Sequence, residues 1–221
     1  MNKIDIRYLQ PLLDETLDIN NVKNSVRKFN PKNRNSASGH GLTIFGIIAS
    51  INAKNVVELG VAQGGTTLSL LLATYSNGGF LTCVDKGVFP INLTWVPDLN
   101  LPYLQNHIKL IRDDSINFLE NYKEEIDLIL VDDWHNGEHV FNELELIKTK
   151  ISKNGIILMH DTMHTNYQPF YNETIQSPES EFGNLGPYGG LKKFIKNNKG
   201  WEYSTIPADH GLTILRKVNK K

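Results

Sequence analysis

Three short segments of this chain, residues 55–59, 127–131 and 155–159, are almost uninterrupted runs of apolar residues. A strand of this composition buries both of its faces, which is typical of a parallel sheet covered by helices on both sides. Segments with helical apolar spacing separate the runs, so strands and helices alternate. The alternation predicts an α/β fold with a mostly parallel sheet. Helices are expected at 42–51, 65–75, 115–122, 137–150 and 190–197, and further strands at 80–84 and 108–111.

The last part of the chain predicts an antiparallel hairpin. Two β-type segments, 201–206 and 212–216, flank the turn sequence Pro-Ala-Asp-His-Gly at 207–211. The chain is expected to form one domain over residues 38–221, preceded by a polar, Asn-rich arm at 1–37 that caps the domain or contacts another subunit. Residues 162–190 interrupt the alternation with a long loop, which we place on the substrate side.

Charge and composition exclude several classes of partner. With 23 Lys and Arg against 24 Asp and Glu, the formal net charge is −1, so no overall positive field would attract nucleic acid or an anionic membrane. The single cysteine, Cys83, lies in an apolar run and is expected to be buried and unpaired. No segment is apolar over 18 residues and no signal-peptide core is visible, which predicts a cytoplasmic protein.

Every strand end in the central part of the sequence carries a carboxylate. Ligands bind beyond the carboxyl ends of the strands in an open parallel sheet, so these residues are the candidates for a site. They are Glu58, Asp85, Asp113 with Asp114, Asp132 with Asp133, and Asp161.

The glycine turn that follows the first strand predicts a cofactor. It reads Gly60-Val-Ala-Gln-Gly64-Gly65 and lacks the complete G-x-G-x-x-G pattern of dinucleotide-binding proteins. Asp85 follows the next strand, where a carboxylate can accept hydrogen bonds from both hydroxyls of a ribose. Asp114 and Ser115 could contact an adenine, but we expect Ser115 to cap the helix 115–122.

Together these motifs resemble the class I S-adenosylmethionine-dependent methyltransferases. The similarity is greatest to the metal-dependent sugar and small-molecule O-methyltransferases related to macrocin and mycinamicin O-methyltransferases, and to cephalosporin hydroxylase-like proteins. It covers residues 38–216 and implies a Rossmann-like, seven-stranded sheet completed by the hairpin. It also implies that Glu58, Gly60 and Gly64 border the methionine part of the cofactor, that Asp85 binds the ribose, and that Asp114 lies near the adenine. The motifs are Val57-Glu-Leu-Gly-Val-Ala-Gln-Gly-Gly-Thr66, Cys83-Val-Asp85, Asp114-Ser115, Leu130-Val-Asp132 to His135, and Gly155-Ile-Ile-Leu-Met-His-Asp161-Thr.

A cation site is predicted between two neighbouring strand ends. Asp132 and Asp161 end adjacent strands about 4.8 Å apart, so both carboxylates can reach one cation, and oxygen ligands favour Mg²⁺. The alternative is a pair of solvated or helix-capping aspartates. His160 stands where the resembling enzymes often carry a second acid, which would favour Mn²⁺, Fe²⁺ or Zn²⁺ or leave the site without metal. The resemblance makes Asp132 a ligand and His135 the candidate base; otherwise His135 caps the next helix.

The methyl acceptor is left open by the sequence. His164, Tyr167 and Tyr188, in and after the long loop, are the acceptor-side candidates. The acceptor is a small molecule such as a sugar, a catechol-like phenol or another natural-product intermediate, and the basic segment 27–34 would suit a nucleotide sugar. The alternative functions are an NAD(P)-dependent oxidoreductase, which should carry a Tyr-x-x-x-Lys pair, and a non-catalytic nucleotide-binding homologue. A homo-oligomer is compatible with the arm.

Overall fold

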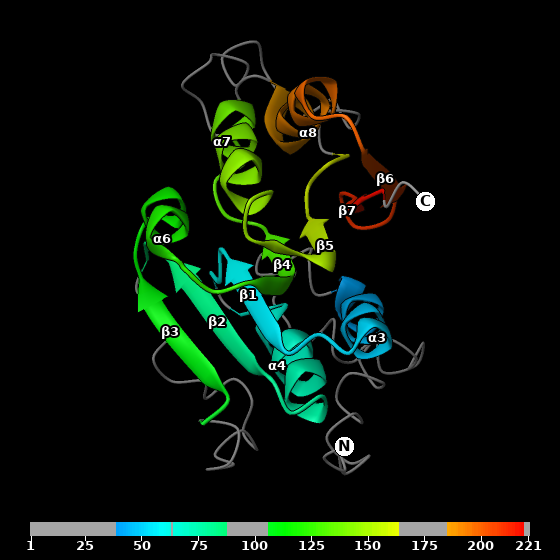
Figure 1. The fold of residues 1–221 in the computed structure, drawn as a ribbon. Helices are drawn as coiled ribbons and strands as arrows, with labels where there is room; N and C mark the ends of the chain where they lie inside the picture. The colour runs from blue at the N-terminus through cyan, green and yellow to red at the C-terminus, as the bar shows by residue number, and fades with distance from the viewer. Residues whose placement is uncertain (1–38, 63, 88–105, 164–184, 219–221) are drawn as a thin grey trace, which may run out of the picture.

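The computed structural model describes residues 39–62, 64–87, 106–163 and 185–218 (Figure 1). The predicted arm at 1–37 lies outside the described residues, as does most of the predicted substrate-side loop, including His164 and Tyr167. No helix in the described ranges is long and apolar enough to cross a membrane.

The strands form a mixed sheet in the order β3-β2-β1-β4-β5-β7-β6. The first five of these are parallel, whereas β7 runs antiparallel to β5 and to β6. This arrangement confirms the predicted seven-stranded, mostly parallel sheet and its terminal hairpin. The strands are β1 (Asn55–Leu59), β2 (Phe80–Asp85), β3 (Ile108–Arg112), β4 (Ile126–Val131), β5 (Ile151–Met159), β6 (Trp201–Ile206) and β7 (Leu212–Lys217).

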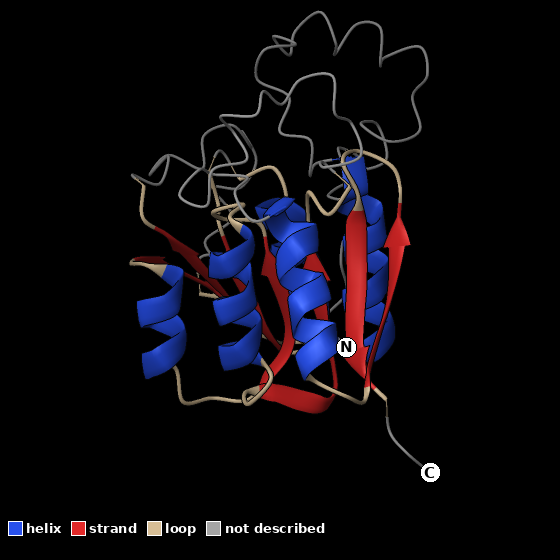
Figure 2. Cartoon of the chain, turned by 90° about the horizontal axis from the view of Figure 1, so that it is seen from above, coloured by secondary structure: helices blue, strands red, loops and turns tan. Residues whose placement is uncertain are grey.

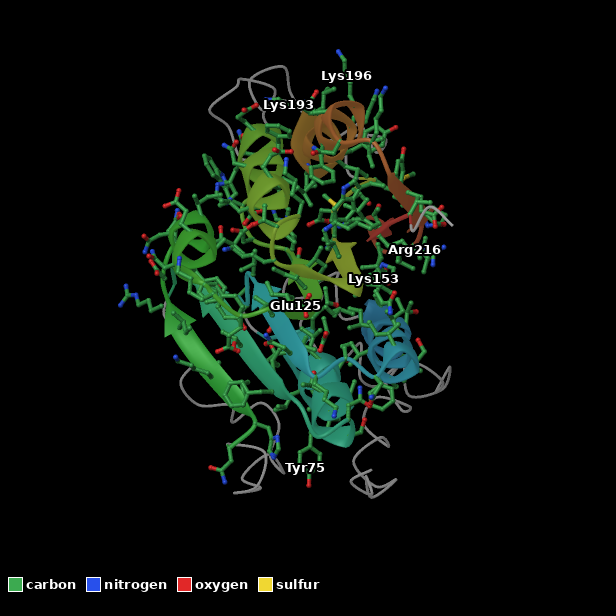
Figure 3. The ribbon with its side chains drawn as sticks, in the orientation of Figure 1. Tyr75, Glu125, Lys153, Lys193, Lys196 and Arg216 are labelled. Carbon is green, nitrogen blue, oxygen red and sulfur yellow. The ribbon has the colours of Figure 1, made fainter. Side chains whose placement is uncertain are left out.

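Helices cover both faces of the sheet (Figure 1). Two of them, α3 (Gly41–Ile51) and α4 (Thr67–Ser76), pack on one face, and α6 (Ser115–Asn121), α7 (Gly137–Ile147) and α8 (Gly186–Asn197) pack on the other. The helix axes run alongside the strands (Figure 2). On α8, Lys193 and Lys196 project from the outer side (Figure 3), and Lys193 Nζ lies 2.6 Å from Glu138 Oε2 of α7.

The hydrophobic core consists of two layers, one on each face. Val56 and Leu128 belong to the layer under α3 and α4, whereas their chain neighbours Val57 and Ile129 belong to the layer under α6, α7 and α8. All four side chains are fully buried. Successive side chains of a strand point to opposite faces, which explains why the central strands are apolar at nearly every position.

The start of α8 differs from the prediction. The helix begins at Gly186 rather than at residue 190, because Pro187 lies in its first turn, where the missing N–H of proline is tolerated. A Cβ on Gly190 would lie 2.6 Å from the backbone oxygen of Gly137. Gly190, the last residue of the predicted loop at 162–190, is therefore inside the helix and packs against α7.

Candidate functional site

The predicted site residues gather at the carboxyl ends of β1, β2, β4 and β5. The turn after β1 contacts the loop after β4. Gly60 has φ +83, and a Cβ there would lie 2.2 Å from the backbone oxygen of Asp132. The neighbouring loop therefore excludes a side chain at position 60. Gly64 also has positive φ, and its N–H donates to the Val61 carbonyl at 2.6 Å.

Glu58 lies fully buried beneath this turn. Its carboxylate accepts hydrogen bonds from Thr66 Oγ1 at 2.5 Å, Thr67 Oγ1 at 2.8 Å and Cys83 Sγ at 3.1 Å. Burial raises the pKa of Glu58 to about 7, although the three donors oppose this. Glu58 thus fixes the first turn of α4 to β1 and titrates near neutral pH. Cys83 is buried, as predicted.

Asp85 lies against the same turn. One of its carboxylate oxygens accepts from the backbone N–H of Val61 at 2.8 Å and of Ala62 at 2.9 Å, and the other accepts from the N–H of Gly87 at 2.6 Å. The two features that predicted a cofactor are therefore adjacent: the glycine turn and the acid after β2. Asp85 also holds the turn in its conformation.

The cap of α6 corrects one prediction. Asp114, not Ser115, is the N-cap, because the Asp114 side chain accepts from the N–H of Asn117 at 3.1 Å. Asp114 also forms an ion pair with Lys86, Nζ to Oδ2 2.5 Å. Ser115 is the first residue of the helix, and its buried hydroxyl lies 3.0 Å from His139 Nε2.

The β4–β5 cluster, defined as Asp132, His135, His160, Asp161 and His210, contains all four predicted cation and base residues, together with His210. His135 Nε2 lies 2.7 Å from Asp161 Oδ2 and 3.6 Å from Asp132 Oδ1. His160 Nδ1 lies 3.3 Å from Asp132 Oδ1 and 3.4 Å from Asp161 Oδ2. The structure therefore brings together the two carboxylates and two of the imidazoles at the ends of adjacent strands.

The orientation of the His160 ring follows from its second nitrogen. Nε2 lies 2.8 Å from the backbone oxygen of Asp209, so Nε2 must carry a proton and donate it. Nδ1 then faces the carboxylates, either as a second N–H or as a lone pair. Burial lowers the pKa of His160, but Asp132 and Asp161 outweigh it and raise the pKa to about 10. Asp161 is buried, yet His135 and His160 hold its pKa well below the usual range.

His210 and His40 were missed as site residues by the sequence analysis. His210 Nδ1 lies 3.2 Å from Asp161 Oδ1, and the His40 ring centroid lies 5.6 Å from that of His160. His40 Nε2 contacts the backbone oxygen of Ala208 at 2.9 Å. Asp161, Asp209 and His210 all have positive φ, a costly conformation for such residues that occurs most often at functional sites. Both histidines lie in short Gly-containing segments, 38–41 and 207–211, that can be identified in the sequence. Nothing in either segment indicates that the two meet in the fold.

Tyr188 lies apart from these contacts. It is half-buried on α8, packs against the core layer under α6, α7 and α8, and has Lys192 Nζ 5.4 Å from its ring centroid. Its predicted acceptor-side role stays a prediction. A hollow of about 940 Å³ runs along β2 and β3 from the amino-terminal ends of the strands, where Lys54, Gly79 and His107 line it, and so lies away from the β4–β5 cluster.

A second group of titratable side chains lies beside the loop that follows β4, apart from the β4–β5 cluster. The α7 cluster consists of Asp133, His139 and Glu143. Burial raises the pKa of Glu143 to about 8, with Asp133 adding to this effect. Burial lowers the pKa of His139, but the carboxylates of Asp133 and Glu143 outweigh it and raise the pKa to about 10. The four-residue spacing of His139 and Glu143 on a predicted helix could have indicated this group.

The chain is similar to methyltransferases in sequence and fold. Residues 57–162 match the family model described as a methyltransferase domain. A flavonoid 3',5'-methyltransferase of Vitis vinifera is 26% identical over 190 residues, which are 80% of this chain and 76% of that protein. A polyamine aminopropyltransferase of Aquifex aeolicus is 26% identical over 81 residues, which are 37% of this chain and 29% of that protein.

Solved structures show the same fold at lower identity. A methyltransferase of Podospora anserina, bound to S-adenosylhomocysteine, has a TM-score of 0.65 at 18% identity and covers 99% of this chain and 100% of that chain. An O-methyltransferase of Streptomyces achromogenes involved in tomaymycin synthesis, solved in complex with S-adenosylmethionine, has a TM-score of 0.62 at 12% identity and covers 98% of this chain and 92% of that chain.

Proposed function

We propose that this chain is a class I S-adenosylmethionine-dependent methyltransferase and that it methylates a hydroxyl oxygen of a small molecule with the help of a divalent cation. The observation that carries the proposal is the β4–β5 cluster. Two carboxylates and two imidazoles meet there within 2.7–3.6 Å, directly beside the turn at Gly60.

The methyl donor, S-adenosylmethionine, is proposed to bind across the ends of β1 and β2. Asp85 offers oxygens for the ribose and Gly60 and Gly64 form the turn next to the methionine part. Asp114 and Ser115, at the start of α6, lie on the adenine side. In this arrangement the acceptor oxygen displaces the sulfur from the methyl carbon, S-adenosylhomocysteine leaves, and the hydroxyl proton passes to the protein. Positioning supplies much of the rate of such a transfer.

Asp132, Asp161 and His160 are proposed to hold the cation. Their donor set fits one: two carboxylates face the Nδ1 of an imidazole whose Nε2 is already committed to the Asp209 carbonyl, the usual arrangement of a metal-binding histidine. A bound cation lowers the pKa of a hydroxyl group that it contacts. Because nitrogen belongs to the donor set, we now favour Mn²⁺, Fe²⁺ or Zn²⁺ over Mg²⁺.

Two histidines, His135 and His210, are candidates for the general base. His135 was the candidate from the sequence, and its Nε2 faces Asp161 and Asp132, a position that also suits a ligand. His210 is 43% exposed and lies against the other oxygen of Asp161, as expected of a base that a carboxylate orients. Replacing the base should lower kcat and remove the corresponding limb of the pH profile, whereas replacing a ligand should weaken cation binding. Separate His135→Gln and His210→Gln variants distinguish the two roles.

The acceptor class is proposed from the relatives. The name of the Vitis vinifera protein specifies a flavonoid acceptor, which supports a phenolic hydroxyl, while the sequence resemblance supports a sugar. We therefore propose a small molecule with neighbouring hydroxyl groups. Nucleic acid is expected to be neither a substrate nor a binding partner of the protein.

Calorimetry with S-adenosylmethionine, followed by a mass-shift screen of phenols, sugars and nucleotide sugars, tests the proposal. We expect binding at micromolar concentration, and the mass gain of one methylene unit on an acceptor, lost with chelator and restored by a divalent cation. No binding at millimolar concentration would refute the proposed function. Transfer that a chelator leaves unchanged would remove only the cation.

A further inference from the structure

The three side chains of the α7 cluster converge on one point outside the β4–β5 cluster. His139 Nε2 lies 3.2 Å from Asp133 Oδ2 and 3.4 Å from Glu143 Oε1. Ser115 Oγ lies 3.0 Å from the same nitrogen. The three donor atoms of the cluster lie within 4.8 Å of one another.

The local structure holds these donors in place. His139 and Glu143 are four residues apart on α7 and so share one face of the helix. Asn136 caps α7 by accepting from the N–H groups of Glu138 and His139, which fixes the end of the helix that carries His139. Asp133 leaves β4 one residue after Asp132, yet it contacts His139, whereas Asp132 contacts His135 and His160.

The one proton on His139 Nε2 cannot satisfy all the oxygens of this cluster. His139 Nε2 can carry one proton, but three oxygens lie within 3.4 Å of it. Glu143 Oε1 faces His139 Nε2 at 3.4 Å, but among the described residues no hydrogen bond of good geometry reaches either carboxylate oxygen of Glu143 or Oδ1 of Asp133. Glu143 is fully buried, and a buried carboxyl group without good hydrogen bonds either stays protonated or needs a counter-charge such as a bound cation.

The spacing of the donors matches a tetrahedral zinc site. Zinc bonds to nitrogen and carboxylate oxygen of about 2.0–2.2 Å place neighbouring ligand atoms about 3.3–3.5 Å apart. The separations of His139 Nε2 from Asp133 Oδ2 and Glu143 Oε1 are 3.2 and 3.4 Å. Two carboxylates and a neutral imidazole carry two negative charges, which one divalent ion would balance. The ligand types, one nitrogen and two oxygens, are those of known zinc sites.

We propose that Asp133, His139 and Glu143 bind a divalent transition-metal ion, best matched by Zn²⁺, in a buried site separate from the β4–β5 cluster. The Ser115 hydroxyl is the candidate for a fourth ligand. Such an ion connects the start of α6, the loop after β4 and the first turns of α7. Its role is structural, since the side chains of Glu143, His139 and Asp133 are 0%, 9% and 18% exposed and closed zinc sites stabilise folds. It thereby fixes the loop that carries Asp132 and His135.

Zinc titration of a chain without the neighbouring carboxylates tests the proposal. Asp132→Asn and Asp161→Asn together disable the β4–β5 cluster, and the protein is stripped with chelator before zinc is added. We expect one zinc per chain, a rise in melting temperature on binding, and the visible absorption of a tetrahedral ion when Co²⁺ replaces zinc. Adding Glu143→Gln should weaken zinc binding at least ~100-fold, while Glu145→Gln, at a half-buried acid of the same helix that pairs with Lys148 instead, should leave it unchanged.

The zinc site is refuted if the double variant with Asp132→Asn and Asp161→Asn binds no zinc. It is also refuted if that variant binds zinc with an affinity that Glu143→Gln leaves unchanged. A wild-type comparison guards against a misfolded variant, because the wild-type chain should bind one zinc more than the His139→Gln variant. Equal zinc content in these two proteins also overturns it. None of these measurements depends on methyl transfer, so the result is independent of the proposed function.

Discussion

Glu58→Gln should change how the stability of the protein depends on pH. Burial raises the pKa of Glu58 from 4.5 to about 7, and each pKa unit corresponds to about 1.4 kcal/mol. The folded protein therefore binds the Glu58 proton more tightly than the unfolded chain, by about 3 kcal/mol. This contribution to stability is fully present below pH 4.5 and is lost as the pH rises through 7. A glutamine has the same shape and does not titrate.

Chemical denaturation at a series of pH values measures the effect. The free energy of unfolding of the wild type minus that of Glu58→Gln should fall by about 2–3 kcal/mol between pH 5 and pH 8. Glu125→Gln is the matched control, since Glu125 is exposed at the end of the chain segment before β4. Its difference from the wild type should stay constant over this range. A Glu58→Gln difference that does not vary with pH would refute the assignment of a raised pKa.

Three further perturbations test the turn, the cofactor side and the cap. Gly60→Ala should destabilise the protein by at least about 2 kcal/mol, because φ is +83 and the new Cβ would lie 2.2 Å from a backbone oxygen. The control Gly46→Ala, where the Cβ meets nothing within 4 Å, should stabilise the protein slightly. Equal melting temperatures of the two variants would contradict this reasoning. Asp85→Asn should weaken S-adenosylmethionine binding about 10-fold or more in calorimetry, because the ribose acceptor and the support of the turn are both lost, whereas Asp161→Asn should retain affinity and lose transfer. Asn136→Ala should lower the unfolding free energy by about 1 kcal/mol through the lost cap of α7, and a denaturation midpoint equal to the wild type would argue against it.

The elements that the sequence predicted correctly are those with a local signature. Each central strand is apolar on both faces, and each is followed by a turn residue, so β1, β4 and the hairpin of β6 and β7 could be located from neighbouring residues alone. The misplaced boundaries are those where tertiary packing changes the local preference. Gly190 lies in a Gly- and Pro-containing segment that is typical of a loop, but it is part of α8. A glycine is needed there because α7 lies too close for a side chain.

The site was predictable only in part, for the same reason. Asp132 and Asp161 end strands whose adjacency follows from the topology, so their meeting could be expected. His40 and His210 reach the site through contacts across the fold. The hydrogen bond between His40 and Ala208 spans 168 positions of sequence, and no periodicity encodes a contact of that range. Likewise, Ser115 resembles a cap until Asp114 is seen to accept the hydrogen bond from Asn117.

The position of β7 between β5 and β6 has a consequence for protein synthesis. His160 and Asp161 follow β5, but the groups that orient them, the Asp209 carbonyl and His210, belong to the turn between the last two strands. A ribosome-bound chain that has released β1 to β5 therefore contains the turn at Gly60 and both strand ends of the β4–β5 cluster. The contacts of His160 and Asp161 to the turn at 207–211 have to wait until Leu212–Lys217 has inserted beside β5.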